Sequence, residues 1–330
     1  MTDKPWYERS WWLIKAIVFL LSCWFIYLHI REEMSLVGDS RRFFLQAIQL
    51  NTTGWWLWFL LLLSFINWSI EAYKWKFLMR SLEEVDFIKA LRAFFNGVTL
   101  SFFTPNRAGE FAGRVIYLRS ENTIKGALLS VIGSSSQLLV TLQFGLLALM
   151  FFIERLVQWS EIEFLVLRIS AAVMIFLCTW AWFRWPRLVR LTDKLNIRTG
   201  WKEKLHVWET CSLNDLLKVW LLSVLRYSVF TAQSVLLYGL LGFQPGVVEV
   251  AGLTALSYLF ITLIPSIALG ELGIRGSVNM ALFYSAGAAP SVILLATFGI
   301  WFINLAFPAL FGATSVLFLK LRKRVTGATP

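Results

Sequence analysis

The feature that most constrains this chain is a series of apolar runs, each about 18 residues or longer, that recur from one end to the other. Runs of that length can cross a hydrocarbon core about 30 Å thick as α-helices. Of the 330 residues, 58% are hydrophobic and only 15% are charged, which is far too apolar for a soluble domain. The short alternating segments typical of a transmembrane β-barrel are absent. The sequence therefore predicts an all-α polytopic membrane protein.

Hydropathy predicts six full transmembrane helices, near residues 12–30, 54–71, 125–153, 164–184, 215–241 and 291–319. Two more apolar stretches, 87–120 and 247–288, are each interrupted near the middle by Pro and Gly. Because neither half of either stretch is comfortably long enough to span, each is predicted to form a re-entrant helical hairpin. The residues assigned to the two breaks are Pro105, Gly109 and Gly113 in the first and Pro265, Gly270 and Gly273 in the second.

The basic residues give an independent prediction of orientation, since the cytoplasmic loops of membrane proteins are enriched in Lys and Arg. These residues concentrate at the N-terminus, in the segment 74–92, in the linker 186–210 and in the tail 320–330. All four regions are therefore predicted to be cytoplasmic, in a bacterial inner membrane. The loop 31–53 is the exception, since it carries three arginines on the predicted outer side.

With this orientation the first hairpin enters from the cytoplasm and the second from the opposite side. The chain then divides into two halves, 1–153 and 154–330, which repeat the order span, span, hairpin, span with inverted orientation. Inverted repeats of this kind are typical of secondary transporters, whose substrate sites lie near the bilayer midplane between the two halves.

Both predicted hairpins carry a Glu that is followed four residues later by an Arg, at Glu110 with Arg114 and at Glu271 with Arg275. Residues at this spacing share one face of a helix. Charge inside a bilayer costs about 2.5 kcal/mol or more per group, so the repetition of charged pairs indicates a functional site. The alternative is that each is a self-contained ion pair with a structural role only.

Two further arginines belong to the candidate site. Arg107 precedes Glu110 at the first break, and Arg226 lies about ten residues into the fifth span, where its side chain cannot easily reach the membrane surface. Arginines beside a helix N-terminus suit an anionic group such as a lipid phosphate. Arg226 is equally well explained by a buried pair with a hairpin carboxylate. Asn67 and Glu71, near the end of the second span, are predicted to make ordinary interhelical hydrogen bonds.

No metal, cofactor or catalytic site is predicted. The two histidines and three cysteines are scattered without the spacing of metal ligands, and no nucleophile with its base and no nucleotide-binding loop is recognisable. Nothing indicates a nucleic-acid partner. The predicted partner is a membrane lipid with an anionic headgroup, and the sequence does not define an oligomeric state.

The stretch from Pro105 to Arg119 reads Pro-Asn-Arg-Ala-Gly-Glu-Phe-Ala-Gly-Arg-Val-Ile-Tyr-Leu-Arg. It resembles the Pro-Gly-Arg-x-Gly-Glu signature of the lysylphosphatidylglycerol synthase transmembrane family, also called flippase-like domain proteins. The stretch from Pro265 to Gly276 is similar to the later Pro-x-x-Gly-Gly-x-Gly-x-x-Glu signature of that family. Here Glu271 stands where the family often has a second Gly, and Gly276 where it often has Glu, so the acidic residue is expected at 271.

The resemblance implies a membrane domain that moves, or is proposed to move, a lipid between leaflets. In the aminoacyl-phosphatidylglycerol synthases a soluble aminoacyl-transferase domain follows this membrane domain. The present chain stops at Pro330, just after the last predicted span, so lysyl transfer is not expected and the protein is not predicted to be an enzyme.

The leading hypothesis is therefore a flippase-type transporter that moves or handles an anionic, phosphate-bearing lipid across the inner membrane. Its arginines bind the anion, while its glutamates orient the arginines or contact the headgroup. One alternative is a membrane-embedded enzyme that acts on a lipid-linked substrate, and another is a scaffold for a separate lipid synthase. The substrate-binding residues of the leading hypothesis are Arg107, Glu110, Arg114, Arg226, Glu271 and Arg275.

Ser120 and Ser285, which follow the two predicted hairpins, test the layout. Each is replaced by Cys in a chain whose three native cysteines are removed, and a membrane-impermeant thiol reagent is applied from one side at a time. We expect Ser120→Cys to react from the cytoplasm and Ser285→Cys from outside. Reaction of Ser120→Cys only from outside would contradict the inverted-repeat layout.

Overall fold

The structure, a computed structural model of the chain, describes residues 54–101, 104, 107–155, 157, 159–189, 204–264 and 268–314. Every regular element within these ranges is a helix. The predicted span near 12–30, the break residues Pro105 and Pro265, residues 190–203 of the basic linker and the tail after residue 314 lie outside the described residues.

Among the described residues, five helices are long and apolar enough to cross a membrane, and they coincide with five of the six predicted spans. The chain is therefore a multi-pass membrane protein. The five helices are α3 (Trp55–Met79), α6 (Thr123–Phe152), α7 (Glu161–Phe183), α10 (Leu213–Leu240) and α13 (Pro290–Trp301), which continues through the π-helix η6 (Phe302–Ala306) to residue 314. Short helical turns between them are η2 (Ser120–Asn122), η3 (Ile153–Arg155), α8 (Trp185–Val189) and η5 (His206–Thr210).

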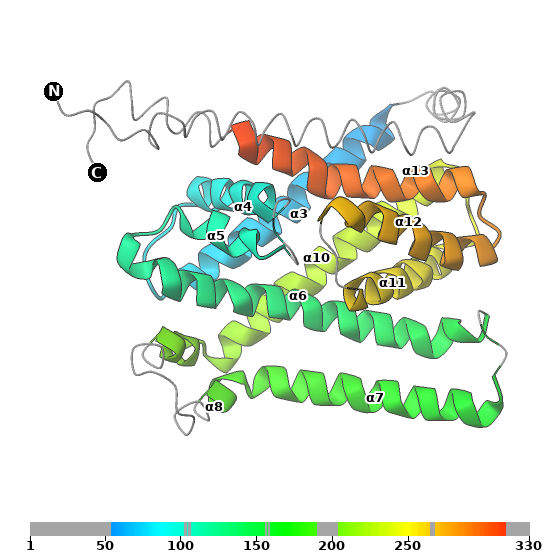
Figure 1. Cartoon of the computed structure of the whole chain (residues 1–330), viewed down its shortest axis with the longest axis horizontal. Coiled ribbons are helices and arrows are strands. Elements are labelled where there is room, and N and C mark those ends of the chain that lie inside the picture. The colour runs from blue at the N-terminus through cyan, green and yellow to red at the C-terminus, as the bar shows by residue number, and fades with distance from the viewer. Residues whose placement is uncertain are drawn as a thin grey trace.

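In Figure 1, α6 and α7 lie side by side, and α13 lies on the opposite side of the described helices. Between them α3 and α10 run obliquely and pack against each other. Because α10 also contacts α6, α7 and α13, it is the central helix of the bundle.

Two of the long helices begin where the sequence supplies an N-cap. Ser160 accepts a hydrogen bond from the Glu163 N–H while the Glu163 carboxylate accepts one from the Ser160 N–H, and Ser212 with Asp215 repeats this capping box at the start of α10. Each box satisfies two backbone donors that the first turn of a helix leaves free. The starts of α7 and α10 are thus fixed by local chemistry.

The end of α3 corrects one sequence prediction. Hydropathy ends the second span at residue 71, but α3 continues to Met79, so Lys74 lies inside the helix rather than in a basic loop. Its side chain is 1% exposed, and its Nζ lies 2.8 Å from Oε2 of Glu71. A hydropathy scale ends the span at these charges because it assumes that each must face water, whereas here they neutralise each other.

The π-helix η6 within the last span has a local cause in Pro308. Proline has no N–H to donate to the carbonyl four residues earlier, and its ring clashes with that carbonyl. Widening the preceding turn into a π-helix accommodates the ring without ending the span, which continues as α-helix after Ala306. As a result Asn304 occupies the widened turn.

Two pairs of shorter helices occupy the stretches in which hairpins were predicted. The first pair is α4 (Phe87–Ser101) and α5 (Gly109–Val115), and the second is α11 (Val247–Leu263) and α12 (Ala268–Ser285). Within each pair the two helices contact each other. Figure 1 shows the first pair at the left of the described part of the molecule and the second pair at the right.

Helices α4 and α5 approach each other so closely that their contact requires glycine. A Cβ atom on Gly113 would lie 2.5 Å from the Asn96 carbonyl oxygen and 2.7 Å from the Cα atom of Gly97. A Cβ atom on Gly109 would similarly meet the carbonyl oxygen of Leu100. Since the contact at 109 falls near the end of α4 and that at 113 one turn earlier, the two helices are antiparallel.

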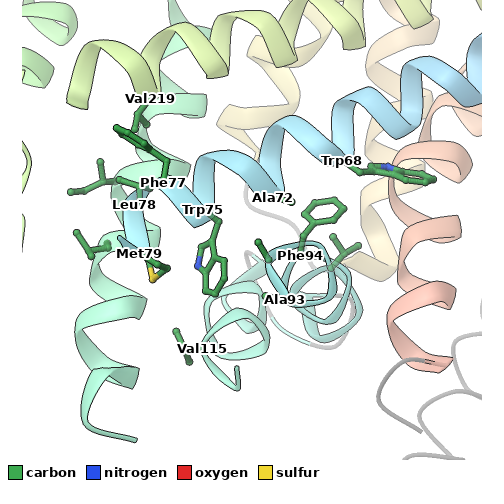
Figure 2. Close-up of a cluster of buried hydrophobic side chains, with 14 of the residues drawn as sticks. Trp68, Ala72, Trp75, Phe77, Leu78, Met79, Ala93, Phe94, Val115 and Val219 are labelled. Atoms are coloured by element: carbon green, nitrogen blue, oxygen red, sulfur yellow. The ribbon is translucent and has the colours of Figure 1, made fainter. Parts of the chain in front are cut away.

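The C-terminal half of α3 provides the hydrophobic surface against which α4 and α5 pack. In Figure 2 the α3 side chains Ala72 and Trp75 face Ala93 of α4 and Val115 of α5. Trp75 is 1% exposed, and its indole Nε1 donates a hydrogen bond of 3.0 Å to the Ser130 hydroxyl of α6. The residues labelled in Figure 2 belong to one core cluster: Trp68, Ala72, Trp75, Phe77, Leu78, Met79, Ala93, Phe94, Val115 and Val219.

We expect Gly113→Ala to separate α4 from α5 and to destabilise the protein by about 1–3 kcal/mol, the usual cost of overpacking. Gly239→Ala in α10 is the matched control, because a Cβ atom there meets nothing within 4 Å. That control should be neutral or slightly stabilising, since Ala is the better helix former by about 1 kcal/mol. Thermal unfolding of the two purified variants in detergent measures the difference, and equal melting temperatures would contradict the close contact.

Candidate functional site

A carboxylate buried in the bundle, that of Glu71 on α3, lies at the centre of a cluster of charged side chains. Its side chain is 3% exposed. Lys74 Nζ lies 2.8 Å and Arg226 Nη1 3.0 Å from Glu71 Oε2, while Arg114 Nη2 lies 2.9 Å from Oε1. The three cations come from α3, α10 and α5, so this one carboxylate connects three helices.

Arg114 extends the cluster to a second carboxylate. It is 2% exposed and forms ion pairs with both Glu71 and Glu110, and Arg107 Nε lies 3.9 Å from Glu110 Oε2. The cluster of Lys74, Arg107, Arg114 and Arg226 with Glu71 and Glu110 therefore has four cations and two anions. With all six side chains ionised it carries two positive charges in excess, a state that favours a bound anion.

A chain of polar side chains continues from Arg226 across the bundle. Arg226 Nε donates to Asn67 Oδ1 at 2.9 Å, and Asn67 Nδ2 donates to Asn304 Oδ1 at 2.8 Å. Asn304 Nδ2 then donates to Gln233 Oε1 at 2.9 Å, and Gln233 Nε2 donates to the Ser64 hydroxyl at 2.7 Å. The chain connects α3, α10 and the π-helix of the last span, and it fixes the orientation of the Arg226 guanidinium.

A cavity of about 200 Å³ adjoins this cluster. Three of its lining side chains are arginines, and none of the described residues that line it is acidic. Gln137 and Arg226, which both line it, lie half-way along the spans α6 and α10, so the cavity is at mid-depth in the bundle. The lining residues are Arg107, Gln137, Thr141, Arg226, Tyr227, Phe230, Tyr258, Ile261, Thr262, Arg275, Ile300, Trp301, Asn304 and Leu305.

Arg107 reaches this cavity from a strained backbone. Its φ angle is 58°, in the left-handed region, which costs a residue other than glycine about 1–2 kcal/mol. Its Nε atom is buried without a hydrogen-bond partner, although the side chain as a whole is 39% exposed. Strain of this kind is concentrated at functional sites, where it holds a group in a required position.

The structure brings some of the predicted site residues to the cavity and places others behind it. Arg107, Arg226 and Arg275 line the cavity. Glu110 and Arg114 are not among the lining residues and belong to the charged cluster behind Arg107 and Arg226.

The remaining predicted residues lie near the two breaks. Glu271 lies in the first turn of α12, and its side chain is outside the described part of the structure. Gly109 and Gly113 lie in α5 against α4, whereas Gly270 and Gly273 lie within α12.

Sequence reasoning missed the importance of Glu71, Lys74 and Asn67. It treated Glu71 and Asn67 as ordinary hydrogen-bonding residues and Lys74 as part of a loop. The spacing of Glu71 and Lys74, three residues apart on an otherwise apolar helix, was the available signal, since it places both on one helix face as in the other charged pairs. The partners on α5 and α10 could not be identified without the fold.

The comparisons with known proteins give one finding. The family model for the lysylphosphatidylglycerol synthase TM region matches residues 42–312 of the chain. No curated protein and no solved structure matches the chain. Within the described residues no group of three or more His, Cys, Asp or Glu side chains could hold a metal ion.

Replacing Glu71 by Gln should leave the buried cations Lys74 and Arg114 and the partly buried Arg226 short of a counter-charge. The expected loss of stability is roughly 3–5 kcal/mol, as when one partner of a buried ion pair is removed. The double variant Glu71→Gln, Lys74→Met should recover part of this loss, because one of the unpaired cations is removed as well. Thermal unfolding in detergent measures both.

Arg80→Gln is the matched control. Arg80, at the end of α3, pairs with Asp215 but is 57% exposed. Loss of its side chain should therefore cost no more than about 1 kcal/mol. If Glu71→Gln unfolds at the same temperature as Arg80→Gln, the cluster does not hold these helices together.

Proposed function

The chain belongs to the lysylphosphatidylglycerol synthase transmembrane family, and from that premise we propose that it is a flippase-type transporter that moves an anionic, phosphate-bearing lipid between leaflets. The observation that carries this proposal is the cavity at mid-depth, which three arginines line and no described acidic side chain enters. An anion there would offset the positive excess of the adjoining cluster.

The size and chemistry of the cavity favour a phosphate group. Arginine presents a planar set of donors that matches phosphate oxygens, and it keeps its charge at any physiological pH. A volume of about 200 Å³ is below the roughly 300–1,000 Å³ of a site that encloses a whole drug-sized ligand. The cavity therefore suits the phosphate of a lipid and not the complete molecule.

The lining of the cavity also supports a more detailed arrangement of the fold, which we propose here. In this layout six spans and two opposed re-entrant hairpins form an inverted repeat, with the halves 1–153 and 154–330 and both termini cytoplasmic in an inner membrane. Its support is that Arg107, at the break of the first helix pair, and Thr262, in the last turn of α11, line one cavity although the two pairs lie at opposite sides of Figure 1. The arginine-bearing loop 31–53, which is the exception to the predicted orientation, lies outside the described residues.

The geometry supports movement of a lipid in preference to catalysis on it. An acid or base must reach the reacting group, typically within hydrogen-bond distance. The buried carboxylate of Glu71 and the partly exposed carboxylate of Glu110 both pair with arginines, and neither lines the cavity. In our proposal they position the arginines that bind the anion.

Arg107→Gly gives the sharpest test, because it removes the guanidinium without penalising the fold. The gain from relieving the left-handed backbone, about 1–2 kcal/mol, offsets the extra freedom that glycine gives the unfolded chain, about 0.5–1 kcal/mol. The variant should therefore be about as stable as the parent. Translocation of fluorescent phosphatidylglycerol in proteoliposomes should fall by about tenfold or more, since a hydrogen bond to a charged group contributes about 1.5–3 kcal/mol.

Arg107→Lys, which keeps the charge, should retain more activity than Arg107→Gly, and the exposed variant Arg80→Gln should retain all of it. Comparing the translocation rate of phosphatidylglycerol with that of zwitterionic phosphatidylcholine measures the contribution of the net headgroup charge. Translocation of phosphatidylglycerol by Arg107→Gly at the parent rate would exclude the cavity as the anion site. Chemical conversion of the lipid by the purified protein would instead favour an enzyme.

A further inference from the structure

An apolar groove of about 630 Å³ lies on the side of the bundle, between α6, α10 and α11. Its lining is almost entirely hydrocarbon, and its rim is open: Phe151 is 70% and Val248 76% exposed. Exposed apolar side chains on membrane-spanning helices face lipid, so the groove opens toward the hydrocarbon of the bilayer.

The groove occupies one half of the membrane thickness. Its lining residues on α6 run from Phe144 to Phe152, in the last third of that helix, and those on α10 run from Tyr227 to Leu236, in the second half. Because both helices are long enough to span, these positions lie between mid-depth and one membrane surface. The deep end of the groove is at Tyr227.

Tyr227 separates the groove from the arginine-lined cavity, since it lines both. Its ring stacks on that of Phe144, with 4.9 Å between centroids and 12° between planes. The residue is 4% exposed, and its hydroxyl is buried without a hydrogen-bond partner. A buried hydroxyl in that state is unfavourable, and because Tyr227 lines both hollows, a ligand that occupies them can supply the acceptor.

We propose that the groove holds one hydrocarbon chain of the lipid whose anionic group occupies the cavity, and that the Tyr227 hydroxyl donates a hydrogen bond to that lipid where the two sites meet. The inference rests on the proposed function and specifies how the substrate lies. The cavity is too small for more than the charged group, so the remainder of the lipid must leave it, and the neighbouring hollow across Tyr227 is apolar and large enough for a chain.

The hydroxyl is tested by Tyr227→Phe, with native mass spectrometry of lipid binding to the purified protein. Removing an unpaired buried hydroxyl should not destabilise the fold, but binding of dipalmitoyl phosphatidylglycerol should weaken about three- to tenfold, the effect of one hydrogen bond. Tyr238→Phe is the matched control, because Tyr238 is 1% exposed on the same helix and lines neither hollow. Unchanged binding by Tyr227→Phe would overturn the role of the hydroxyl.

The groove is tested by Ala232→Trp, which fills it from an exposed position on α10, with Leu221→Trp as the control on a part of α10 that does not line it. We expect Ala232→Trp to weaken binding of dipalmitoyl phosphatidylglycerol by at least about tenfold while sparing dihexanoyl phosphatidylglycerol, because only the long chain needs the buried apolar area. An unchanged preference for the longer chain would overturn the groove assignment.

Two other outcomes are distinguishable in the same spectra. If Arg107→Gly leaves the binding of both lipids unchanged, the proposed anion site fails, whatever Ala232→Trp does. If Ala232→Trp changes the oligomeric state and not lipid binding, the groove is an interface with a second copy of the chain, and the proposal is wrong.

Discussion

The carboxylate of Glu71 is the interaction on which the rest of the site depends. Ionised groups inside a bilayer must be paired, and this one accepts three cations from three helices. Helix α5 has only seven residues, which is too short to be stable by its own backbone hydrogen bonds. Its contact with α4 through Gly113 and the ion pair of Arg114 with Glu71 hold it in place, and Arg107 at its start is positioned by the same contacts.

The arginines consequently lie in different surroundings, although their residue type is the same. Arg114 is enclosed by two carboxylates and does not line the cavity, whereas Arg107 and Arg226 each combine a contact to the cluster with a place at the cavity. Arg226 shows the combination most clearly, since Glu71 and Asn67 fix its guanidinium while Phe230 lies beneath it at 5.1 Å. A binding group fixed in this way loses little side-chain freedom when a ligand arrives.

The sequence could predict the spans because apolar length is a local property, and five of them agree with the structure. It could also identify Arg107, Arg226 and Arg275 as candidates, because a charge in an apolar run is conspicuous wherever it lies. The prediction failed at Lys74, which was placed in a solvent-exposed segment although its ion-pair partner, Glu71, lies one helical turn away. Nor could it find the cavity or the groove, since both depend on which helices pack together, and Tyr227 has no local feature that distinguishes it from other tyrosines.

The mid-depth position of the cavity has an electrical consequence. Moving one elementary charge across the whole membrane through a potential of 100 mV changes its energy by about 2.3 kcal/mol, so an anion held half-way experiences about half of that. The equilibrium constant for an anion to reach the arginines from one side then rises or falls roughly sevenfold per 100 mV, depending on the sign of the potential. In the proposed function, occupancy of the cavity therefore responds to membrane voltage through the charge of the bound anion.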